Sequence, residues 1–234
     1  MNDRGGGRLE DGSCWFGKPI TSLVLRADDE ALADLAERAE ETGAARLAAL
    51  LADSGPLVDF LRSTCVLSPF LRDSFRRRPA MLEHLFDEDL DARLTTILNE
   101  IDAFGRQGGT NEAGLMQALR EAKGEAHALI ALASLAGVAS AQTTVRRLSA
   151  LADACVGAAV DFLLIEAHDA GKLTLPDRDH PAEGSGWIVL GMGKLGAAEL
   201  NFSSDIDLIV FYDPEAPGIP DPMEATDLFA RRFG

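Results

Sequence analysis

Two carboxylates, Asp205 and Asp207, are two positions apart in the sequence and follow a glycine-rich turn. They belong to the segment 187–213, WIVLGMGKLGAAELNFSSDIDLIVFYD. Side chains of an extended strand alternate between its faces, so two acids at this spacing point the same way. Mg²⁺ prefers one or two carboxylates plus the phosphate oxygens of a substrate. Asp205 and Asp207 are therefore predicted to be metal ligands and catalytic residues of a phosphoryl-transfer site.

The turn before the acids has the composition of a phosphate-binding loop. Gly191 and Gly193 let the backbone expose its N–H groups to an anion. Ser204 could position phosphate or fix the turn, and Lys194 could neutralise phosphate or be a solvated lysine. We therefore take Gly191, Gly193, Lys194 and Ser204 as candidate phosphate- or nucleotide-binding residues. Asn201, which follows the turn, is expected mainly to hold its shape.

The same turn reads G-x-G-x-x-G, which is also the fingerprint of a dinucleotide-binding Rossmann unit. Asp213, at the end of the second apolar run, would then be the ribose ligand. That fold needs a crossover of a dozen or more residues between two parallel strands. Only residues 197–204 separate the turn from the next run. The spacing therefore disfavours the Rossmann interpretation and favours a strand, a glycine-rich turn and a second strand that carries the two acids.

The elements that must position this segment are mostly helical. Apolar residues recur every three or four positions through residues 28–170, which predicts a helical bundle. Ser68 and Pro69 are expected to begin a helix that ends near Arg77, and Gly105 is expected to end a later one. The period then becomes extended, with buried strands expected around 188–190 and at 208–212.

The fold class expected from this pattern is α+β. The expected parts are a flexible N-terminal segment (1–27), a helical region (28–170), a linker (171–186) and the first part of a nucleotidyltransferase domain (187–234). An amphipathic helix is expected to begin in the last part, at 223–233.

Composition limits the classes of function. The net charge of −16 in 234 residues disfavours nucleic acid and anionic membranes as partners. The three cysteines are widely spaced, as expected of a reducing compartment without a zinc site. No signal peptide is evident, and the apolar stretches look too short to cross a membrane. These features predict a cytoplasmic protein.

The string GMGKLGAAELNFSSDIDLI closely resembles the glutamine synthetase adenylyltransferase family, in its first, adenylyl-removing copy. The helical strings SPFLRD, at 68–73, and ASLAG, at 133–137, resemble the N-terminal region of that family. The family carries two nucleotidyltransferase domains of the DNA polymerase beta type. Its third catalytic carboxylate lies in a D-x-R-L-R-P type segment that this chain does not contain. The chain therefore looks like the N-terminal part of a longer protein and is expected to be inactive or nearly so alone.

The resemblance implies phosphorolysis: inorganic phosphate attacks AMP on a tyrosine of glutamine synthetase and gives ADP and the unmodified enzyme. It also implies Mg²⁺ as cofactor, adenylyl transfer from ATP in a second domain, and control by the PII signalling protein. Two alternatives stay open. The same fold could serve another acceptor, or the chain could be a regulatory module that senses nucleotide without turnover.

Overall fold

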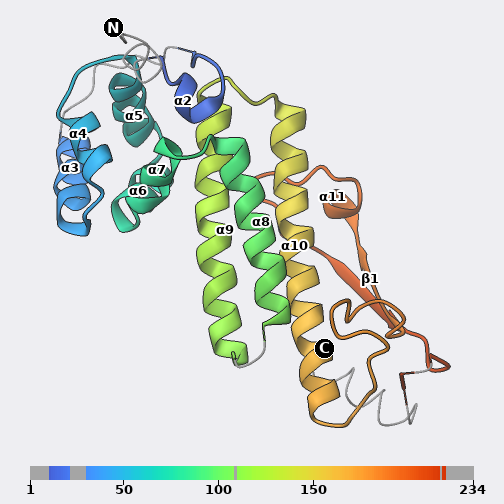
Figure 1. Cartoon of the computed structure of the whole chain (residues 1–234). Coiled ribbons are helices and arrows are strands. Elements are labelled where there is room, and N and C mark those ends of the chain that lie inside the picture. Colours follow the sequence, from blue (N-terminus) through green and yellow to red (C-terminus); the bar gives the residue numbers. More distant parts are fainter. Residues whose placement is uncertain (1–10, 22–29, 108–109, 217, 220–234) are drawn as a thin grey trace, which may run out of the picture. The chain divides into compact units, whose positions relative to one another are not determined.

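A computed structural model describes residues 11–21, 30–107, 110–216 and 218–219 of the chain (Figure 1). The expected helix at 223–233 lies outside these residues. The described part is mostly helical with one two-stranded sheet, so the α+β class is confirmed. In chain order the elements are α2 (Ser13–Phe16), α3 (Glu30–Thr42), α4 (Ala45–Leu51), α5 (Pro56–Leu67), α6 (Pro69–Arg77), α7 (Ala80–Glu83), η1 (His84–Phe86), α8 (Leu90–Arg106), α9 (Glu112–Leu135), α10 (Ala141–Asp169), β1 (Trp187–Gly191), α11 (Gly193–Gly196) and β2 (Leu208–Tyr212).

The chain divides into two compact units, residues 1–97 with 123–144 and residues 98–122 with 145–234. The boundaries between the units fall inside the long helices α8 and α9 and near the start of α10. They do not coincide with residues 171–186, where a linker was expected. That segment instead contributes Leu173 and Leu175 to the core of the second unit.

Helix ends in the first unit follow from local hydrogen bonding. Pro69 begins α6, and the hydroxyl of Ser68 accepts a hydrogen bond from the N–H of Leu71 at 3.2 Å, as expected of an N-cap. Helix α4 has no cap from its own N-cap residue, Ala44. Its second and third N–H groups are satisfied by Glu83 of α7, whose carboxylate accepts from Arg46 N at 3.2 Å and from Leu47 N at 2.9 Å.

The core of the first unit is rich in aromatic side chains. Trp15 of α2 is fully buried and meets Phe86 edge-on, with ring centroids 5.4 Å apart. Phe16 meets Phe60 of α5 in the same way at 6.0 Å. The expectation of a flexible segment through residue 27 was therefore wrong for residues 11–21. Two adjacent aromatic residues bury enough apolar surface to anchor a short stretch of otherwise polar chain.

A buried ion pair joins α8 to α9 within the first unit. Arg93 Nε lies 2.7 Å from Glu125 Oε1, and both side chains are about nine-tenths buried. In the second unit, Arg106 at the other end of α8 pairs with Asp161 of α10 at 3.1 Å. The guanidinium of Arg106 is half-buried, whereas the carboxylate of Asp161 is almost fully covered. One helix therefore carries an interhelical ion pair in each unit.

Gly105 is a helical residue and not the expected helix end, because α8 continues to Arg106. A Cβ atom at Gly105 would lie 2.5 Å from the carbonyl oxygen of Ala158 in α10. The glycine therefore allows two helix backbones of the second unit to approach closely, which no other residue would permit.

Helix α10 is long and apolar enough to cross a membrane by length and composition. The expectation that no apolar stretch reaches that length was therefore wrong. The helix nevertheless contains polar residues that contact other parts of the protein: Asp161 pairs with Arg106, and Ser149 accepts a hydrogen bond from the N–H of Leu200. The same composition suits a core helix, and Ala158 is the small residue of α10 against which Gly105 packs closely.

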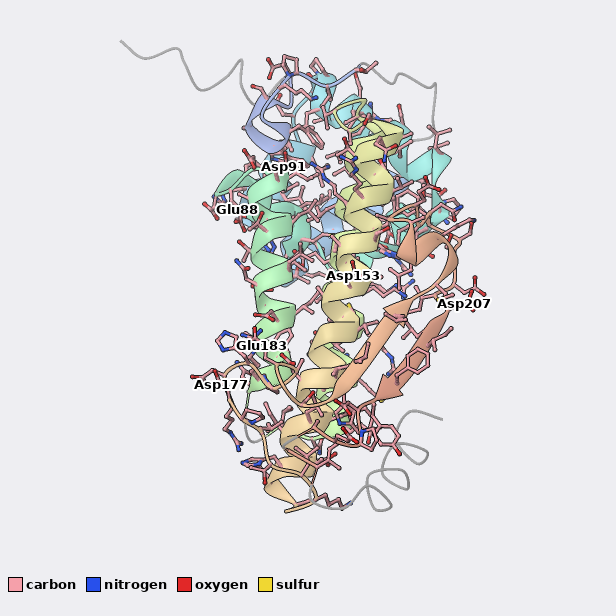
Figure 2. The ribbon with its side chains drawn as sticks, turned by 90° about the vertical axis from the view of Figure 1, so that its right-hand side faces the viewer. Glu88, Asp91, Asp153, Asp177, Glu183 and Asp207 are labelled. Carbon is pink, nitrogen blue, oxygen red and sulfur yellow. The ribbon has the colours of Figure 1, made fainter. Side chains whose placement is uncertain are left out.

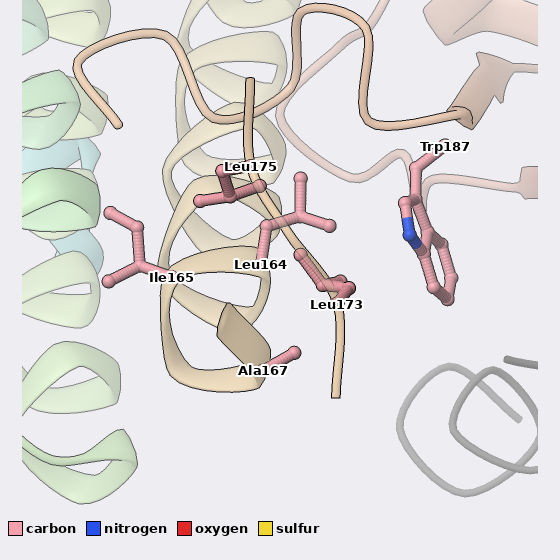
Figure 3. Packing of buried hydrophobic residues seen from close by; sticks show 6 residues of the cluster. All are labelled: Leu164, Ile165, Ala167, Leu173, Leu175 and Trp187. Atoms are coloured by element: carbon pink, nitrogen blue, oxygen red, sulfur yellow. The ribbon is translucent and has the colours of Figure 1, made fainter. Parts of the chain in front are cut away.

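The two strands form an antiparallel hairpin in which Trp187 pairs with Tyr212 and Gly191 with Leu208. The antiparallel pairing excludes the Rossmann unit, whose strands are parallel. One face of the hairpin belongs to a cluster of buried residues from α10 and the segment after it, to which Trp187 contributes and against which Val210 packs (Figure 3). That cluster consists of Leu164, Ile165, Ala167, Leu173, Leu175 and Trp187.

No described residue covers the other face of the hairpin. Ile188 and Leu190 of β1 stand opposite Phe211 and Ile209 of β2, and all four side chains are exposed among the described residues. The two strands therefore lie where they were expected, but the expectation that they are buried was wrong for this face. Directly paired residues share a face, so these four side chains form one continuous apolar surface.

Candidate functional site

The candidate site lies at the end of the hairpin where the chain passes from β1 to β2. Gly191 closes the strand pairing opposite Leu208, and the N–H of Met192 then donates to the carbonyl oxygen of Asp207 at 2.9 Å. This bond extends the ladder by one step and places the glycine turn directly beside the Asp205–Asp207 segment. Both aspartates precede β2 and are exposed. In the view of Figure 2, Asp207 lies at the outer edge of the hairpin.

The glycine turn itself is a single helical turn, α11. Gly193 has a φ of +54°, and no atom of the described residues lies within 4 Å of the place where its Cβ would stand. A Cβ on Gly196 would lie 2.4 Å from the carbonyl oxygen of Gly191. Gly196 therefore lets the turn fold back on the strand, while Gly193 leaves its outer side open to a ligand. The first N–H groups of a helix lack intrahelical acceptors, and here they include those of Gly193 and Lys194.

Two of the predicted phosphate-binding side chains meet across the turn. Lys194 Nζ lies 3.5 Å from Ser204 Oγ. The same hydroxyl accepts from the N–H of Asn201 at 3.2 Å and donates to Asn201 Oδ1 at 3.0 Å. The ammonium of Lys194 is exposed, so it can contact an anion as well as Ser204. The contact brings together Lys194 and Ser204, which are ten residues apart in sequence.

Asn201 organises the segment that leads to the aspartates. Its Oδ1 accepts from the N–H of Ser203 at 3.0 Å, from the hydroxyl of Ser203 at 3.1 Å and from that of Ser204. These bonds fold residues 201–204 into a tight polar turn. The expectation that Asn201 holds the shape of the loop is therefore confirmed.

One contributor to the site carries no sequence signal. Ser149 of α10 accepts a hydrogen bond from the N–H of Leu200, the residue before Asn201, at 3.2 Å. Leu195 of α11 and Leu200 are the buried residues on either side of this loop. A serine inside a long apolar helix gives no hint of such a contact. Only the three-dimensional structure could have identified it.

The residues that the structure assembles suit a magnesium ion only together with a substrate. No group of three or more histidine, cysteine, aspartate or glutamate side chains suited to a metal occurs in the described part of the chain. Asp205 and Asp207 provide two hard oxygen ligands in an exposed position. Magnesium is usually held by one or two carboxylates, water and substrate phosphate, so the donor set fits that ion. An exposed ammonium and hydroxyl beside the carboxylates suit the phosphate.

Comparison with known proteins gives a consistent family match. The sequence profile of glutamate-ammonia ligase adenylyltransferase matches residues 58–231. A bifunctional glutamine synthetase adenylyltransferase/adenylyl-removing enzyme of Mesorhizobium japonicum is 57% identical over 221 residues, which are 93% of this chain and 22% of that protein. The enzyme of the same name from Brucella suis is 50% identical, with 91% of this chain and 22% of that protein covered. That from Bartonella quintana is 44% identical, with 86% and 20% covered. The chain thus spans about a fifth of the length of these relatives.

Proposed function

This chain belongs to the glutamate-ammonia ligase adenylyltransferase family, and we propose that it is part of an enzyme that removes adenylyl groups from glutamine synthetase. The relatives combine an adenylyltransferase and an adenylyl-removing activity in their names. We assign the removing activity to the domain that begins at residue 187. The hairpin with its glycine turn and two aspartates supports the view that this domain is a nucleotidyltransferase of the DNA polymerase beta type.

The observation that carries the proposal is the hydrogen bond between Met192 N and Asp207 O. It holds the glycine turn beside two carboxylates, with Lys194 and Ser204 in contact across the turn, which supports the proposal that the turn binds phosphate. Asp205 and Asp207 would hold Mg²⁺. Bound there, the ion would neutralise phosphate charge and polarise the phosphorus that is attacked. The N–H groups of the turn and the Lys194 ammonium would orient the phosphate groups.

The reaction is an in-line displacement at phosphorus. An oxygen of inorganic phosphate forms a new bond to the phosphorus of the AMP group, and the bond from that phosphorus to the tyrosine oxygen breaks. The products are ADP and a tyrosine whose oxygen takes up a proton. Such a transfer depends mainly on position and charge neutralisation, which this set of residues can provide. Water must be kept from replacing phosphate as the nucleophile, so orientation of phosphate by Lys194 and Ser204 is a requirement of the proposal.

Two further parts of the proposal rest on the resemblance to the family, and a third, the location in the cell, rests on composition. Adenylyl transfer from ATP belongs to a second domain outside this chain, and the PII signalling protein controls the balance of the two activities. The protein acts in the cytoplasm. Because a third carboxylate is expected outside this chain, residues 1–234 alone should show little or no turnover.

The decisive test is replacement of Asp205 by Asn in the full-length protein. The amide keeps the shape of the side chain but loses the charge that holds the cation. We expect ADP formation from adenylylated glutamine synthetase and phosphate to fall at least about 100-fold, since metal stabilisation of a transition state is worth several kcal/mol.

Asp213→Asn is the matched control. Asp213 is also exposed but lies at the opposite end of β2, where its carboxylate accepts from the N–H of Glu215 at 2.9 Å. This variant should keep normal turnover. Wild-type turnover by Asp205→Asn would exclude the proposed function. Equal losses in both variants would indicate a general loss of folding and not a role of Asp205 in the reaction.

A further inference from the structure

Ser149 is almost completely buried in α10, with 2% of its surface exposed. Its hydroxyl donates to the carbonyl oxygen of Val145, one turn earlier, at 2.9 Å. The same oxygen accepts from the N–H of Leu200 at 3.2 Å. Ser149 therefore uses both its donor and an acceptor position, and the second contact joins residues that are 51 positions apart.

The contact matters because Leu200 is itself only 4% exposed. A buried N–H that loses its partner retains the cost of having been removed from water. Without the Ser149 hydroxyl the segment at Leu200 would have to shift to expose this N–H, or to admit a water molecule. An alanine at position 149 would fill the space without restoring the bond.

The segment that would shift leads directly to the candidate site. Asn201 follows Leu200, and its side chain holds Ser203 and Ser204 through three hydrogen bonds. Ser204 contacts Lys194 and immediately precedes Asp205. A displacement at Leu200 is therefore transmitted to the predicted phosphate-binding and metal-binding residues along five residues of chain.

We propose that Ser149 is a positioning residue for the phosphate and metal site at Lys194, Asp205 and Asp207. It acts through Leu200 and the Asn201 turn and does not touch the substrate. This inference rests on the proposed function of the site. It makes a helix outside the strand–turn–strand motif a part of the machinery that sets the geometry of the carboxylates.

A purely structural role is the competing explanation. Serine in a helix often bonds to the carbonyl four residues earlier, which adds nothing to function. Ser63 of α5 provides a matched control because it is equally buried and donates to the carbonyl of Asp59 at 2.8 Å. It lies in the first unit, whereas the candidate site lies in the second.

The test compares Ser149→Ala, Ser149→Thr and Ser63→Ala in the full-length protein. The readouts are kcat, KM for inorganic phosphate, Mn²⁺ affinity measured by electron paramagnetic resonance, and the thermal midpoint. Groups that orient metal ligands from outside typically change affinity or activity by 10- to 100-fold. We expect Ser149→Ala to lose about tenfold in kcat/KM and to weaken Mn²⁺ binding. Both are measured at a temperature well below the thermal midpoint of the variant, where it is folded.

Ser149→Thr keeps the hydroxyl and should recover most of both losses, whereas Ser63→Ala should change only the thermal midpoint. If Ser149→Ala does not fold, Ser149→Cys replaces it, because a thiol keeps the volume but accepts hydrogen bonds weakly. Unchanged kcat, KM and Mn²⁺ affinity in the folded variant would overturn the inference.

Asp205→Asn is measured in parallel. An inactive Asp205→Asn beside an unaffected Ser149→Ala overturns only the role of Ser149, whereas an active Asp205→Asn overturns the proposed function as well.

Discussion

Helix α5 and the β-hairpin differ in how far their apolar side chains are buried. Phe60 of α5 is fully buried, whereas Phe211 of β2 is 49% exposed. In the first unit, α5 packs against α3 and α6, and most of its apolar side chains are buried. In the second, the described residues cover only one face of the hairpin. An apolar sequence therefore predicts that a surface should be covered, and the neighbouring elements decide whether it is.

The pattern of the strands makes the same point. An antiparallel strand with one wet face usually alternates apolar and polar residues. The sequences WIVLG and LIVFY have apolar residues on both faces, which is typical of strands covered on both sides. The inner face meets α10, and the outer face of Ile188, Leu190, Ile209 and Phe211 has the composition of a surface that is meant to be packed.

The largest effect is expected for Phe60→Ala. Loss of a fully buried aromatic ring leaves a cavity and should lower the free energy of unfolding by about 3–5 kcal/mol. Urea denaturation followed by circular dichroism measures this change. Phe70→Ala is the control within the same unit, since Phe70 is 50% exposed and should cost far less. Equal losses in the two variants would show that exposure does not distinguish these positions.

A medium effect is expected for Glu83→Gln, which tests how the first unit fixes its short helices. Burial acts to raise the pKa of the Glu83 carboxyl, but hydrogen bonds from Arg46 and Leu47 outweigh burial. The pKa therefore lies below its ordinary value of 4.5. At neutral pH the substitution should cost about 1–2 kcal/mol, because hydrogen bonds to a charged group are lost.

The sign of the pH dependence follows from the lowered pKa. A carboxyl with a lower pKa in the folded state stabilises the fold above the pKa of the unfolded state. This contribution is lost as the pH falls through the folded-state pKa, below 4.5. The stability difference between wild type and Glu83→Gln should therefore be constant at neutral pH and vanish in acid. Glu41→Gln, at an exposed pair with Arg38, should show only a small difference at neutral pH. If the stability difference between wild type and Glu83→Gln became larger in acid, the stabilising role of the Glu83 carboxylate at the start of α4 would be contradicted.

The smallest effect is expected for Phe211→Ala. Its side chain is exposed and its direct cross-strand partner is Ile188, so the loss should stay below about 1 kcal/mol in the 234-residue chain. Repeating the measurement in the full-length protein sharpens the comparison. A cost there that approaches that of Phe60→Ala would show that another element covers this face, whereas equal small costs in both would show that the face stays open.

Local chemistry was predictable from the sequence where it depends on neighbouring residues. The Ser68 cap, the start of α6 at Pro69 and the bounds of β2 follow from residue types within one or two turns. No separate helix was predicted for Pro56–Leu67, because Gly55 and Pro56 favour a turn as well as the start of a helix. Gly105 looked like a helix end because a close approach to Ala158 has no sequence signature.

The same division applies to the candidate site. The spacing of Gly191, Asp205 and Asp207 predicted two strands joined by a glycine turn beside two acids, and the structure adds that the strands pair as an antiparallel hairpin. The link from Ser149 to Leu200 could not be predicted, because it depends on how a distant helix packs. Metal and phosphate binding by these residues remain predictions that the proposed experiments test.

The three long helices also determine how the chain could be taken apart. The chain passes between the two units near residues 97, 122 and 144, within α8 and α9 and close to the start of α10. A helix interior resists proteases, because its backbone is hydrogen-bonded and cannot fit an extended cleavage site without local unfolding. Cutting a single loop would thus release neither unit as an intact piece. Limited proteolysis should cut loops first, and an expression boundary placed inside α9 near residue 122 would divide both cores at once.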